Sequence, residues 1–451
     1  MSLTVERPRT SVEAPRTLLE QPPRALGLSD QLGLWANLGI TLTLPAAAGY
    51  VLLPGMSLLA ALTAVVVGSF AGSALLALAA VPGARTGAPA MVLLRGLFGW
   101  RGSLLPTALN VVQCLGWTVV EIVIIATTAH GLAPDVPRWV FVVLGGAAAT
   151  GLALRPLGVV RVLRRYAVWL VVAASIYLFA RVLARPLPSF THGSWHGFAA
   201  SLDLVIALPV SWVPLAADYT RHARSGRAAG VGALGGFGTA CTLYFSLGVL
   251  AVAAYPKASD GSAALVALPA AGLALAVLVI DELDEAFANL YSTAVSAQNV
   301  QPALDRRWLA LGVGALATVL AIGADYAEYE SFLYLIGAVF VPLTAVFVVD
   351  YWVLRRGTWD TSREAPRRLR MLLPWLAGFA AYELVAPTYI PQWLGWSAWW
   401  VHRRSDLGFS TPPSWLSASL TALVVAGVLT VVLGWSGDGT RPGPRARRVR
   451  G

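Results

Sequence analysis

The chain has 451 residues, of which 57% are hydrophobic and only 12% are charged, and its mean hydropathy is +0.67. Soluble domains carry about 25% charged residues, so this composition excludes an ordinary soluble protein and indicates an all-α polytopic membrane protein. The net charge of +10 comes almost entirely from Arg between apolar runs, which favours a role in membrane orientation over nucleic-acid binding.

The apolar segments predict about twelve membrane-spanning helices of roughly 20 residues each. They are preceded by a polar, Pro- and Arg-rich stretch over residues 1–28, which has no hydrophobic core near Met1. We expect this stretch to be a disordered cytoplasmic tail and not a cleaved signal. The expected spans cover residues 31–53, 57–81, 104–129, 138–154, 166–184, 199–219, 230–254, 264–300, 308–324, 329–353, 370–390 and 414–435.

The distribution of basic residues predicts the orientation of these spans. Most of the 33 Lys and Arg residues lie in the two tails and in alternate loops, as in the run from Arg161 to Arg165. The other loops carry few basic residues, among them Arg138 and Lys257. Because cytoplasmic loops are enriched in Lys and Arg, we expect a multi-pass protein of the cytoplasmic membrane with both termini in the cytoplasm.

Two of the expected spans are interrupted at corresponding places. The first span contains Gly39 and Pro45 in its middle, and the sixth contains Pro209 and Pro214. Such residues free backbone groups, which only a cavity or a bound ion can satisfy inside a membrane. One interruption alone is often a packing kink, but a pair of them five spans apart indicates an inverted repeat with a midplane binding site. The expected units are repeats over 29–185 and 199–354, two extra helices over 366–436, and a basic cytoplasmic tail over 437–451.

The third span carries a polar stripe. Spacings of three and four place Asn110, Gln113, Trp117 and Glu121 on one helix face. An indole can cover the face of a flat heterocycle, and a carboxyl group one turn away can meet a ring edge with an amine beside a ring nitrogen. The alternative is that Trp117 packs against a neighbouring span and that Glu121 is a structural hydrogen-bonding group.

The eighth span contains a second polar stripe, although no Lys or Arg lies between Lys257 and Arg306. Its members are Asp281, Glu282, Asp284, Glu285, Asn289, Ser292 and Ser296. An Asp at the bilayer centre costs about 2.5–3.5 kcal/mol even on lenient scales, so we expect these acids to line a cavity. The alternative is that some of them, Asp281 and Glu282 above all, reach the interface or pair with Arg from other spans. Asp218, which ends the sixth span, is predicted to be structural.

Other features carry no functional prediction. The Gly-rich stretch from Gly230 to Gly238 opens a membrane span and does not follow a strand, so it lacks the context of a phosphate-binding loop. His192 and His196 have the spacing of metal ligands, but no third ligand is near them. Cys114 and Cys241 lie in apolar segments and support neither a disulfide framework nor a metal site.

Several motifs resemble the nucleobase:cation symporter-1 family, the purine–cytosine permeases. The run TGAPAMVLLRGLFGWRGS over 86–103 resembles the linker between the second and third helices of that family, and ADYTR over 217–221 resembles the end of its sixth helix. SWVPL over 211–215 and DEAFANLYS over 284–292 resemble the branch of hydroxymethylpyrimidine and cytosine transporters. The resemblance covers the chain from about Ser29 to Trp435.

This resemblance implies the five-plus-five inverted-repeat fold of sodium-coupled symporters, with two broken helices and two extra helices. It also implies that Trp117 stacks on the substrate ring, that Glu121 bonds the ring edge, and that Asn289 bonds the substrate. The other residues of the expected substrate site are Gln113, Ser211, Trp212 and Glu285. Whether Trp212 or Pro209 takes the second stacking position is left open by the alignment of the sixth helix.

The family's sodium site uses carbonyl groups of the first helix and groups of the eighth helix. The corresponding positions here are Gly39, Leu42, Ile280, Leu283 and Asp284. Relatives commonly carry a pair of hydroxyl residues where this chain has Leu283 and Asp284. The resemblance therefore leaves both Na+ and H+ as candidate coupling ions.

Taken together, these features predict a secondary active transporter that imports a small aminopyrimidine, hydroxymethylpyrimidine or cytosine, by cation symport and alternating access. A permease for another purine or pyrimidine base, or for a hydantoin-like ring, is the alternative within this class. From other classes, the alternatives are an intramembrane enzyme that holds magnesium on its paired acids, and a passive channel. The expected partners are the heterocyclic base and the lipid bilayer. No cofactor besides the coupling ion, no metal beyond the sodium site, no nucleic acid and no obligatory protein partner is expected.

Overall fold

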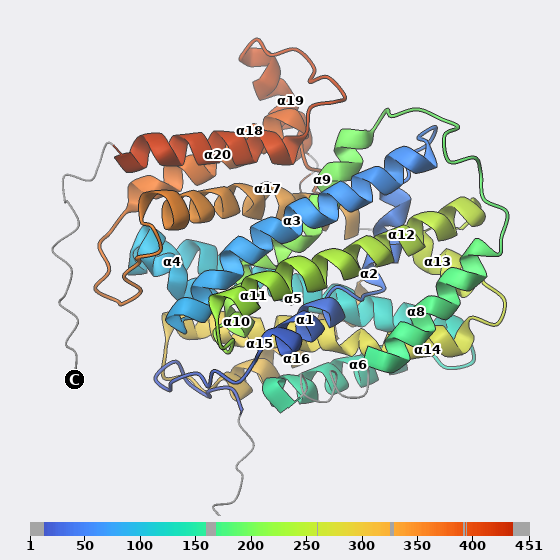
Figure 1. Cartoon of the computed structure of the whole chain (residues 1–451), viewed down its shortest axis with the longest axis horizontal. Helices are drawn as coiled ribbons and strands as arrows, with labels where there is room; N and C mark the ends of the chain where they lie inside the picture. Colours follow the sequence, from blue (N-terminus) through green and yellow to red (C-terminus); the bar gives the residue numbers. More distant parts are fainter. Residues whose placement is uncertain are drawn as a thin grey trace, which may run out of the picture.

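The computed structural model describes residues 13–158, 168–258, 260–324, 329–390, 393 and 395–435, and this part of the chain is helical, without strands. The long helices α3 (Leu58–Thr86) and α12 (Gly238–Ala254) run along the long axis of the molecule and pack together (Figure 1). The expected all-α architecture is confirmed.

The helices follow one another as two sets of five, and each set begins with an interrupted helix. The first set consists of α1 (Leu28–Asn37) with α2 (Thr43–Ala47) and η1 (Ala48–Tyr50), α3, α5 (Trp100–Leu132), α6 (Arg138–Ala153) and α8 (Val168–Leu183). The second consists of α9 (Phe198–Ser211) with α10 (Val213–Thr220), α11 (Gly226–Val231) with η3 (Gly232–Phe237) and α12, α14 (Gly272–Asp281) with α15 (Leu283–Val300), α16 (Arg306–Gly323), and α17 (Tyr329–Val348) with η5 (Val349–Leu354). A short helix follows the second member of each set, α4 (Ala90–Phe98) and α13 (Gly261–Val266).

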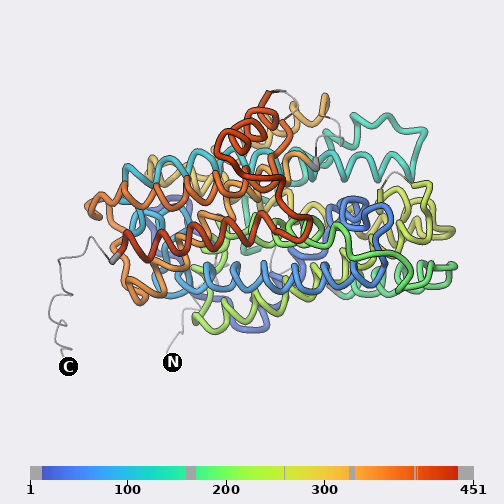
Figure 2. Tube along the Cα trace, turned by 90° about the horizontal axis from the view of Figure 1, so that it is seen from above, coloured from blue at the N-terminus to red at the C-terminus, as the bar shows by residue number. Residues whose placement is uncertain are grey.

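The C-terminal helices form an addition to one side of this core. After η6 (Leu369–Met371), α18 (Leu372–Val385) and α20 (Ala418–Trp435) pack on each other and on α17. Between them, α19 (Trp396–Asp406) projects from the body, as Figure 1 and Figure 2 both show. The two extra helices of the sequence prediction are therefore α18 and α20, and α19 was not expected.

Six helices of the described chain, some with a break inside, are long and apolar enough to cross a membrane. They span Leu58–Thr86, Trp100–Leu132, Phe198–Thr220, Gly226–Ala254, Arg306–Gly323 and Ser331–Leu354. Shorter apolar helices cover Arg138–Ala153, Trp169–Leu183 and Ala418–Gly434. A multi-pass membrane protein is supported, and the count of twelve spans stays a prediction.

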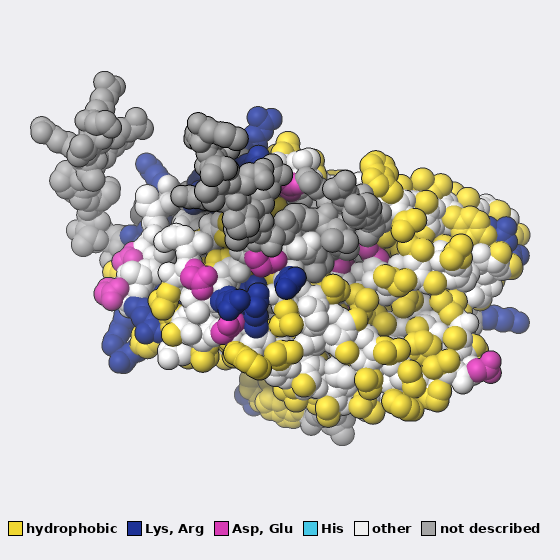
Figure 3. All heavy atoms as spheres, turned by 90° about the horizontal axis from the view of Figure 1, so that it is seen from below, with side chains coloured by type: hydrophobic (Ala, Val, Ile, Leu, Met, Phe, Trp, Pro, Cys, Tyr) yellow, Lys and Arg dark blue, Asp and Glu magenta, His cyan; other side chains and the backbone are white. Residues whose placement is uncertain are grey.

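The surface is divided between an apolar band and a charged end. Figure 3 shows hydrophobic side chains over most of one face, whereas Arg, Lys and acidic side chains gather toward the end that carries α4 in Figure 1. An apolar band flanked by a basic end fits a protein that crosses a bilayer along its long axis. The cytoplasmic position of that end remains a prediction.

The eighth expected span differs from its predicted bounds. The apolar run that was expected to begin it at residue 264 belongs to α13 and to a turn, and the helix itself begins only at Gly272. The reason is local: Pro269 has no backbone N–H to donate, and Ala270 adopts a left-handed conformation with φ of 60°. The helix is interrupted again at Glu282, between α14 and α15.

The Gly-rich segment Gly230–Gly238 serves close packing between helices. Its middle forms η3, a turn of π-helix, which packs against α1. A Cβ on Gly236 would lie 2.7 Å from the carbonyl oxygen of Leu32, and one on Gly232 would lie 2.6 Å from the Cβ of Gln31. Both distances are too short for a side chain, so glycine is what allows α1 to approach this closely.

Part of the stretch 1–28, which was expected to be a disordered tail, packs on the helix ends: residues 13–27 contact them, and residues 1–12 lie outside the described chain. The Glu13 carboxylate accepts hydrogen bonds from the backbone N–H groups of Leu157 (2.8 Å) and Gly158 (3.0 Å). The buried Arg306 guanidinium donates to the carbonyl oxygen of Pro15 at 2.8 Å. Charged side chains that satisfy backbone groups explain why a polar segment is ordered here.

The other end of this segment is fixed by His222. The imidazole Nδ1 lies 3.0 Å from the carbonyl oxygen of Pro23. Burial lowers the pKa of His222 to about 3, so the ring is neutral at physiological pH and can donate its remaining N–H to that carbonyl. Residues 13–27 thus connect α16 with the turn that follows α10.

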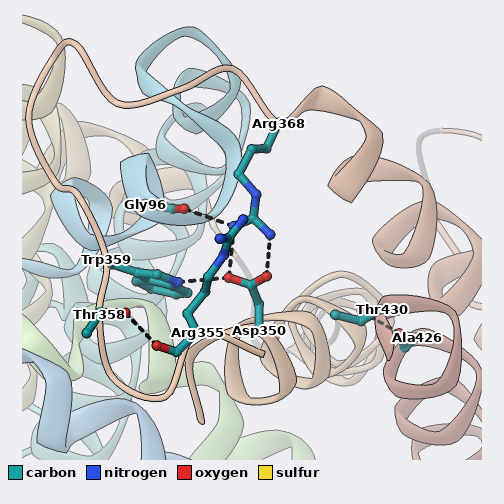
Figure 4. Close-up of polar contacts among 8 residues, drawn as sticks. All are labelled: Gly96, Asp350, Arg355, Thr358, Trp359, Arg368, Ala426 and Thr430. Carbon is teal, nitrogen blue, oxygen red and sulfur yellow. Dashed lines mark hydrogen bonds and ion pairs between the residues drawn. The ribbon is translucent and has the colours of Figure 1, made fainter. Parts of the chain in front are cut away.

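A buried ion pair fixes the segment that follows α17 (Figure 4). The Arg368 guanidinium donates to both carboxylate oxygens of Asp350, at 2.5 and 2.9 Å, and to the carbonyl oxygen of Gly96 at 3.1 Å. The Trp359 indole N–H donates to the same carboxylate at 2.8 Å. Asp350 is fully buried, and Arg368 is 9% exposed. The pair therefore ties the segment between α17 and α18 to α4.

We expect Asp350→Asn to destabilise the protein by about 3–5 kcal/mol, because it leaves a buried guanidinium without its counter-charge. Thermal unfolding of the purified protein in detergent measures this loss. The matched control is Asp406→Asn, which breaks an exposed ion pair with Arg403 at 3.0 Å and should cost at most about 1 kcal/mol. Equal losses in the two variants would contradict this account of the Asp350 pair.

Candidate functional site

The interruption between α1 and α2 is held by one carboxylate. Glu282, from the break between α14 and α15, accepts hydrogen bonds from the Thr41 hydroxyl (2.6 Å) and the Leu42 backbone N–H (2.7 Å). Its side chain is 1% exposed. A break in a membrane helix leaves backbone donors without partners, and here a charged acceptor from another broken helix satisfies one of them. The two breaks therefore meet.

A threonine hydroxyl links this carboxylate to the third span. The Thr43 hydroxyl lies 3.1 and 3.2 Å from the two carboxyl oxygens of Glu121 and 3.2 Å from Glu282. Glu121 is fully buried, and its carboxyl group is also within hydrogen-bonding reach of the carboxyl groups of Glu282 and Glu285. The polar face of α5 that carries Glu121 thus lies close to the acids at the start of α15, with Thr43 of α2 in contact with both.

The remaining acids of the eighth helix are buried as well. Asp281 is 4% exposed and Asp284 is 1% exposed. The amide of Asn37, at the end of α1, donates to Asp284. Among the residues that the structure describes, no Lys or Arg lies within ion-pair distance of Glu121 or of the four acids from Asp281 to Glu285. The alternative in which Asp281 and Glu282 reach the interface or pair with Arg finds no support.

A small cavity lies beside this acidic cluster. The residues that line it are Trp117, Leu208, Ser211, Trp212, Leu215, Glu285 and Asn289. The free space inside it is about 10 Å³, room for about one water molecule, so the site is closed in this structure and a ring can enter only when side chains or helices move. Five of the seven lining residues belong to the predicted substrate site.

Both tryptophans are fixed by aromatic neighbours. Trp117 packs edge-on against Phe332, with ring centroids 5.4 Å apart, and Trp212 contacts the rings of Trp35 and Phe237. Trp212 is the single residue between α9 and α10, so the break in the sixth helix brings its indole to the cavity. Trp212, and not Pro209, thus lies among the residues that line the cavity.

The other predicted substrate residues have structural partners. The Gln113 amide donates to the carbonyl oxygen of Ser211 at 2.7 Å, which ties α5 to the end of α9. The Ser211 hydroxyl donates to the carbonyl oxygen of Leu208 at 2.6 Å, and the Asn289 amide donates to that of Glu285 at 3.1 Å. Gln113 and Glu121 are not among the residues that line the cavity.

The predicted cation ligands are spread more widely. Gly39 and Leu42 lie in the non-helical stretch after α1, and the Leu42 carbonyl oxygen accepts a hydrogen bond from the Ser262 hydroxyl at 3.2 Å. Asp284 contacts this region through Asn37. The Ile280 side chain is 69% exposed, and Leu283 packs on apolar residues of α6 and α16, so both could contribute only backbone atoms.

Sequence reasoning missed the group that joins the two breaks. Glu282 was treated as one of the less important acids, and Thr41, Thr43 and Asn37 were not singled out. Asp218 is structural as expected: it accepts a hydrogen bond from the backbone N–H of Ala90, at the start of α4, at 2.9 Å. A signal for the threonines was present, since hydroxyl residues flanked the predicted helix break.

Comparison with known proteins identifies the family to which most of the chain is similar. The family described as permease for cytosine/purines, uracil, thiamine and allantoin matches residues 24–364. A putative purine-cytosine permease of Bacillus subtilis (strain 168) is 23% identical over 365 residues, which cover 74% of this chain and 77% of that protein. The cytosine permease of Escherichia coli O157:H7 is 28% identical over 290 residues, covering 61% and 66%.

Among solved structures, Mhp1 has a similar fold. Mhp1 is a nucleobase-cation-symport-1 family transporter, solved in a closed conformation with bromovinylhydantoin bound, and it matches with a TM-score of 0.72. The identity is 16%, and the match covers 94% of this chain and 95% of Mhp1. A Na+-coupled sialic acid symporter matches with a TM-score of 0.55 at 12% identity, covering 91% of this chain and 90% of that one. At these identities the likeness concerns the fold alone.

We expect Glu282→Gln to lower the stability of the protein by about 1–3 kcal/mol, because an amide N–H would face the donors that the carboxylate now accepts. The matched control is Glu285→Gln on the next turn. The Glu285 Oε1 atom has no hydrogen-bond partner within the described chain, so this variant should cost less. Thermal unfolding in detergent compares the two, and a larger loss for Glu285→Gln would contradict the role given to Glu282.

Proposed function

The chain belongs to the family of permeases for cytosine and purines, and from this premise we propose that it is a secondary active transporter that imports a small aminopyrimidine together with a cation. Members of this family are permeases and not enzymes. Hydroxymethylpyrimidine and cytosine are the substrates that fit the proposal best.

One observation carries the proposal: the cavity combines two indoles, a carboxylate and an amide at the point where broken helices meet. Indole faces suit a flat aromatic ring. The carboxylate of Glu285 and the amide of Asn289 can bond a ring edge that presents an amine beside a ring nitrogen.

The position of the cavity supports alternating access. The segment from α9 to α10 lines the cavity through Ser211, Trp212 and Leu215, and α5 and α15 line it through Trp117 and Glu285. A relative movement of these two pairs would open the cavity to one side at a time, which is the general scheme of transporters with inverted repeats.

The coupling cation is placed, in this proposal, between the break after α1 and the start of α15. In this proposal Gly39, Leu42 and Asp284 are the residues that would bind the cation. The Asp284 Oδ1 atom has no hydrogen-bond partner within the described chain. A hard cation prefers oxygen ligands, which carbonyl and carboxylate groups provide. Na+ and H+ both remain candidates.

The second candidate is a permease for another base or for a hydantoin-like ring. The printed description of the family includes uracil and allantoin, and Mhp1 was solved with a hydantoin. A passive channel is disfavoured because the cavity is small and is closed in by bulky aromatic side chains.

We expect cells that express the protein to accumulate labelled hydroxymethylpyrimidine or cytosine, and to lose this accumulation when ionophores collapse the cation gradients. Competitive uptake with a panel of bases, in which sodium and pH are varied independently, measures both the substrate and the coupling ion. Failure to accumulate either compound would overturn the substrate assignment. Accumulation that ignores the ionophores would favour a channel.

We also expect Glu121→Gln to reduce aminopyrimidine uptake by about tenfold or more while protein abundance stays near that of the unchanged protein. Glu121 bonds Thr43 and lies within reach of Glu285, so its carboxyl group shapes the acidic edge of the cavity. Uptake is normalised to the amount of protein in the membrane. Equal losses of uptake and abundance would indicate a folding role alone.

A further inference from the structure

We propose that the cavity selects its solute by charge: it prefers a ring with a positively charged, amidine-like edge over the same ring when neutral, and it excludes rings that carry a negative charge. This inference rests on the proposed function and specifies the substrate class of the same site.

The first ground is that two polar side chains of the cavity wall, Glu285 and Ser211, present acceptors. The Glu285 side chain is only 4% exposed, and its Oε1 atom has no hydrogen-bond donor within the described chain. The Ser211 hydroxyl donates its proton to the carbonyl oxygen of Leu208. The lone pairs of the hydroxyl oxygen are therefore left to accept a hydrogen bond from a ligand. A buried acceptor without a donor costs free energy until a ligand supplies one. These two side chains therefore favour a solute that donates hydrogen bonds.

The neighbours of Glu285 do not meet this need. The Thr41 hydroxyl has one proton, and it donates to Glu282 at 2.6 Å. Glu121 is a second carboxyl group and, when protonated, can give Glu285 one hydrogen bond, whereas an ionised Glu285 has about four acceptor sites. Acceptor sites of Glu285 are therefore left for the solute.

The second ground is that several donors near the helix break already donate to acceptors of the chain itself. The backbone N–H of Leu42 and the hydroxyl of Thr41 donate to Glu282, and the amide of Asn37 donates to Asp284. The Gln113 amide donates to the carbonyl oxygen of Ser211. The chain's own carboxylates thus occupy the place that an anionic group of a solute would need at the helix break.

The third ground is the balance of charge. Five buried carboxyl groups, Glu121 and the four from Asp281 to Glu285, lie together, and within the described chain none forms an ion pair with Lys or Arg. Carboxyl groups this close share protons, so not all five are ionised at once, and one coupling cation offsets part of the charge of those that are. A solute with a positive edge would offset more, whereas an anion would add to the repulsion.

The aromatic side chains fit the same conclusion. The indoles of Trp117 and Trp212 both line the cavity. The face of an indole attracts a cation, and indole gives the strongest such attraction among aromatic side chains. An aminopyrimidinium ring also shares its positive charge with the exocyclic amine, whose N–H groups can donate charge-assisted hydrogen bonds to a carboxylate such as that of Glu285.

The test uses one ring in three charge states in proteoliposomes that hold the full-length protein. The probes are 4-aminopyrimidine, 1-methyl-4-aminopyrimidinium and 4-aminopyrimidine-5-carboxylate, each competing with counterflow exchange of labelled cytosine at neutral pH. We expect the cation to compete about tenfold better than the neutral ring and the carboxylate about tenfold or more worse.

Two variants of the cavity and one control locate the effect. Glu285→Gln should bring the cation and the neutral ring to within about twofold of each other, and Asn289→Asp should increase the preference for the cation. Glu383→Gln is the control, because Glu383 is buried but bonds Thr388 in another part of the fold; it should leave the ratio unchanged. If a variant does not exchange cytosine, thermal shift with the three probes gives the same ratio.

The outcomes separate this inference from the proposed function. Cytosine exchange with equal competition by all three rings, or a ratio that neither cavity variant changes, overturns the charge selection and leaves the transporter standing. Stabilisation by the cationic ring without exchange of any base overturns the proposed transport and supports the charge selection.

Discussion

The contact between Glu282 and the break after α1 is the interaction on which the rest of the site depends. It satisfies the N–H of Leu42 and the hydroxyl of Thr41 with one carboxylate from a second broken helix. Neither break could persist in a bilayer if its polar groups were left without partners. By satisfying each other, the two breaks bring Glu121, Glu285 and the tryptophans of the cavity together.

This arrangement has a cost that points toward function. Carboxyl groups that share a small buried volume repel one another, and a protein built only for stability would replace them with apolar side chains. The retained acids, the donors already bound to them, and the acceptor of Glu285 at the cavity wall together describe a site that attracts donors and cations. Transport of a cation with an amine-bearing ring uses all three properties.

Sequence patterns predicted the helical architecture, the paired breaks and most of the cavity lining. Trp117, Glu285 and Asn289 could be found because helical spacing and the cost of buried charge are local properties. Glu282 and Thr41 could not, because their importance lies in a contact between helices 240 residues apart. The packed segment 13–27 and the late start of α14 were missed for related reasons, since the first depends on tertiary partners and the second on the turn at Ala270.

The most direct measurement is an experimental structure of the protein in a lipid environment with an aminopyrimidine bound. The account predicts density for the ring between Trp117 and Trp212, with its amine edge toward Glu285 and with Glu282 still bound to the break after α1. Ring density elsewhere, for instance in the separate cavity lined by Thr127, Asp260 and Ser262, would contradict it. So would a structure in which Glu282 and Glu285 face the acyl chains.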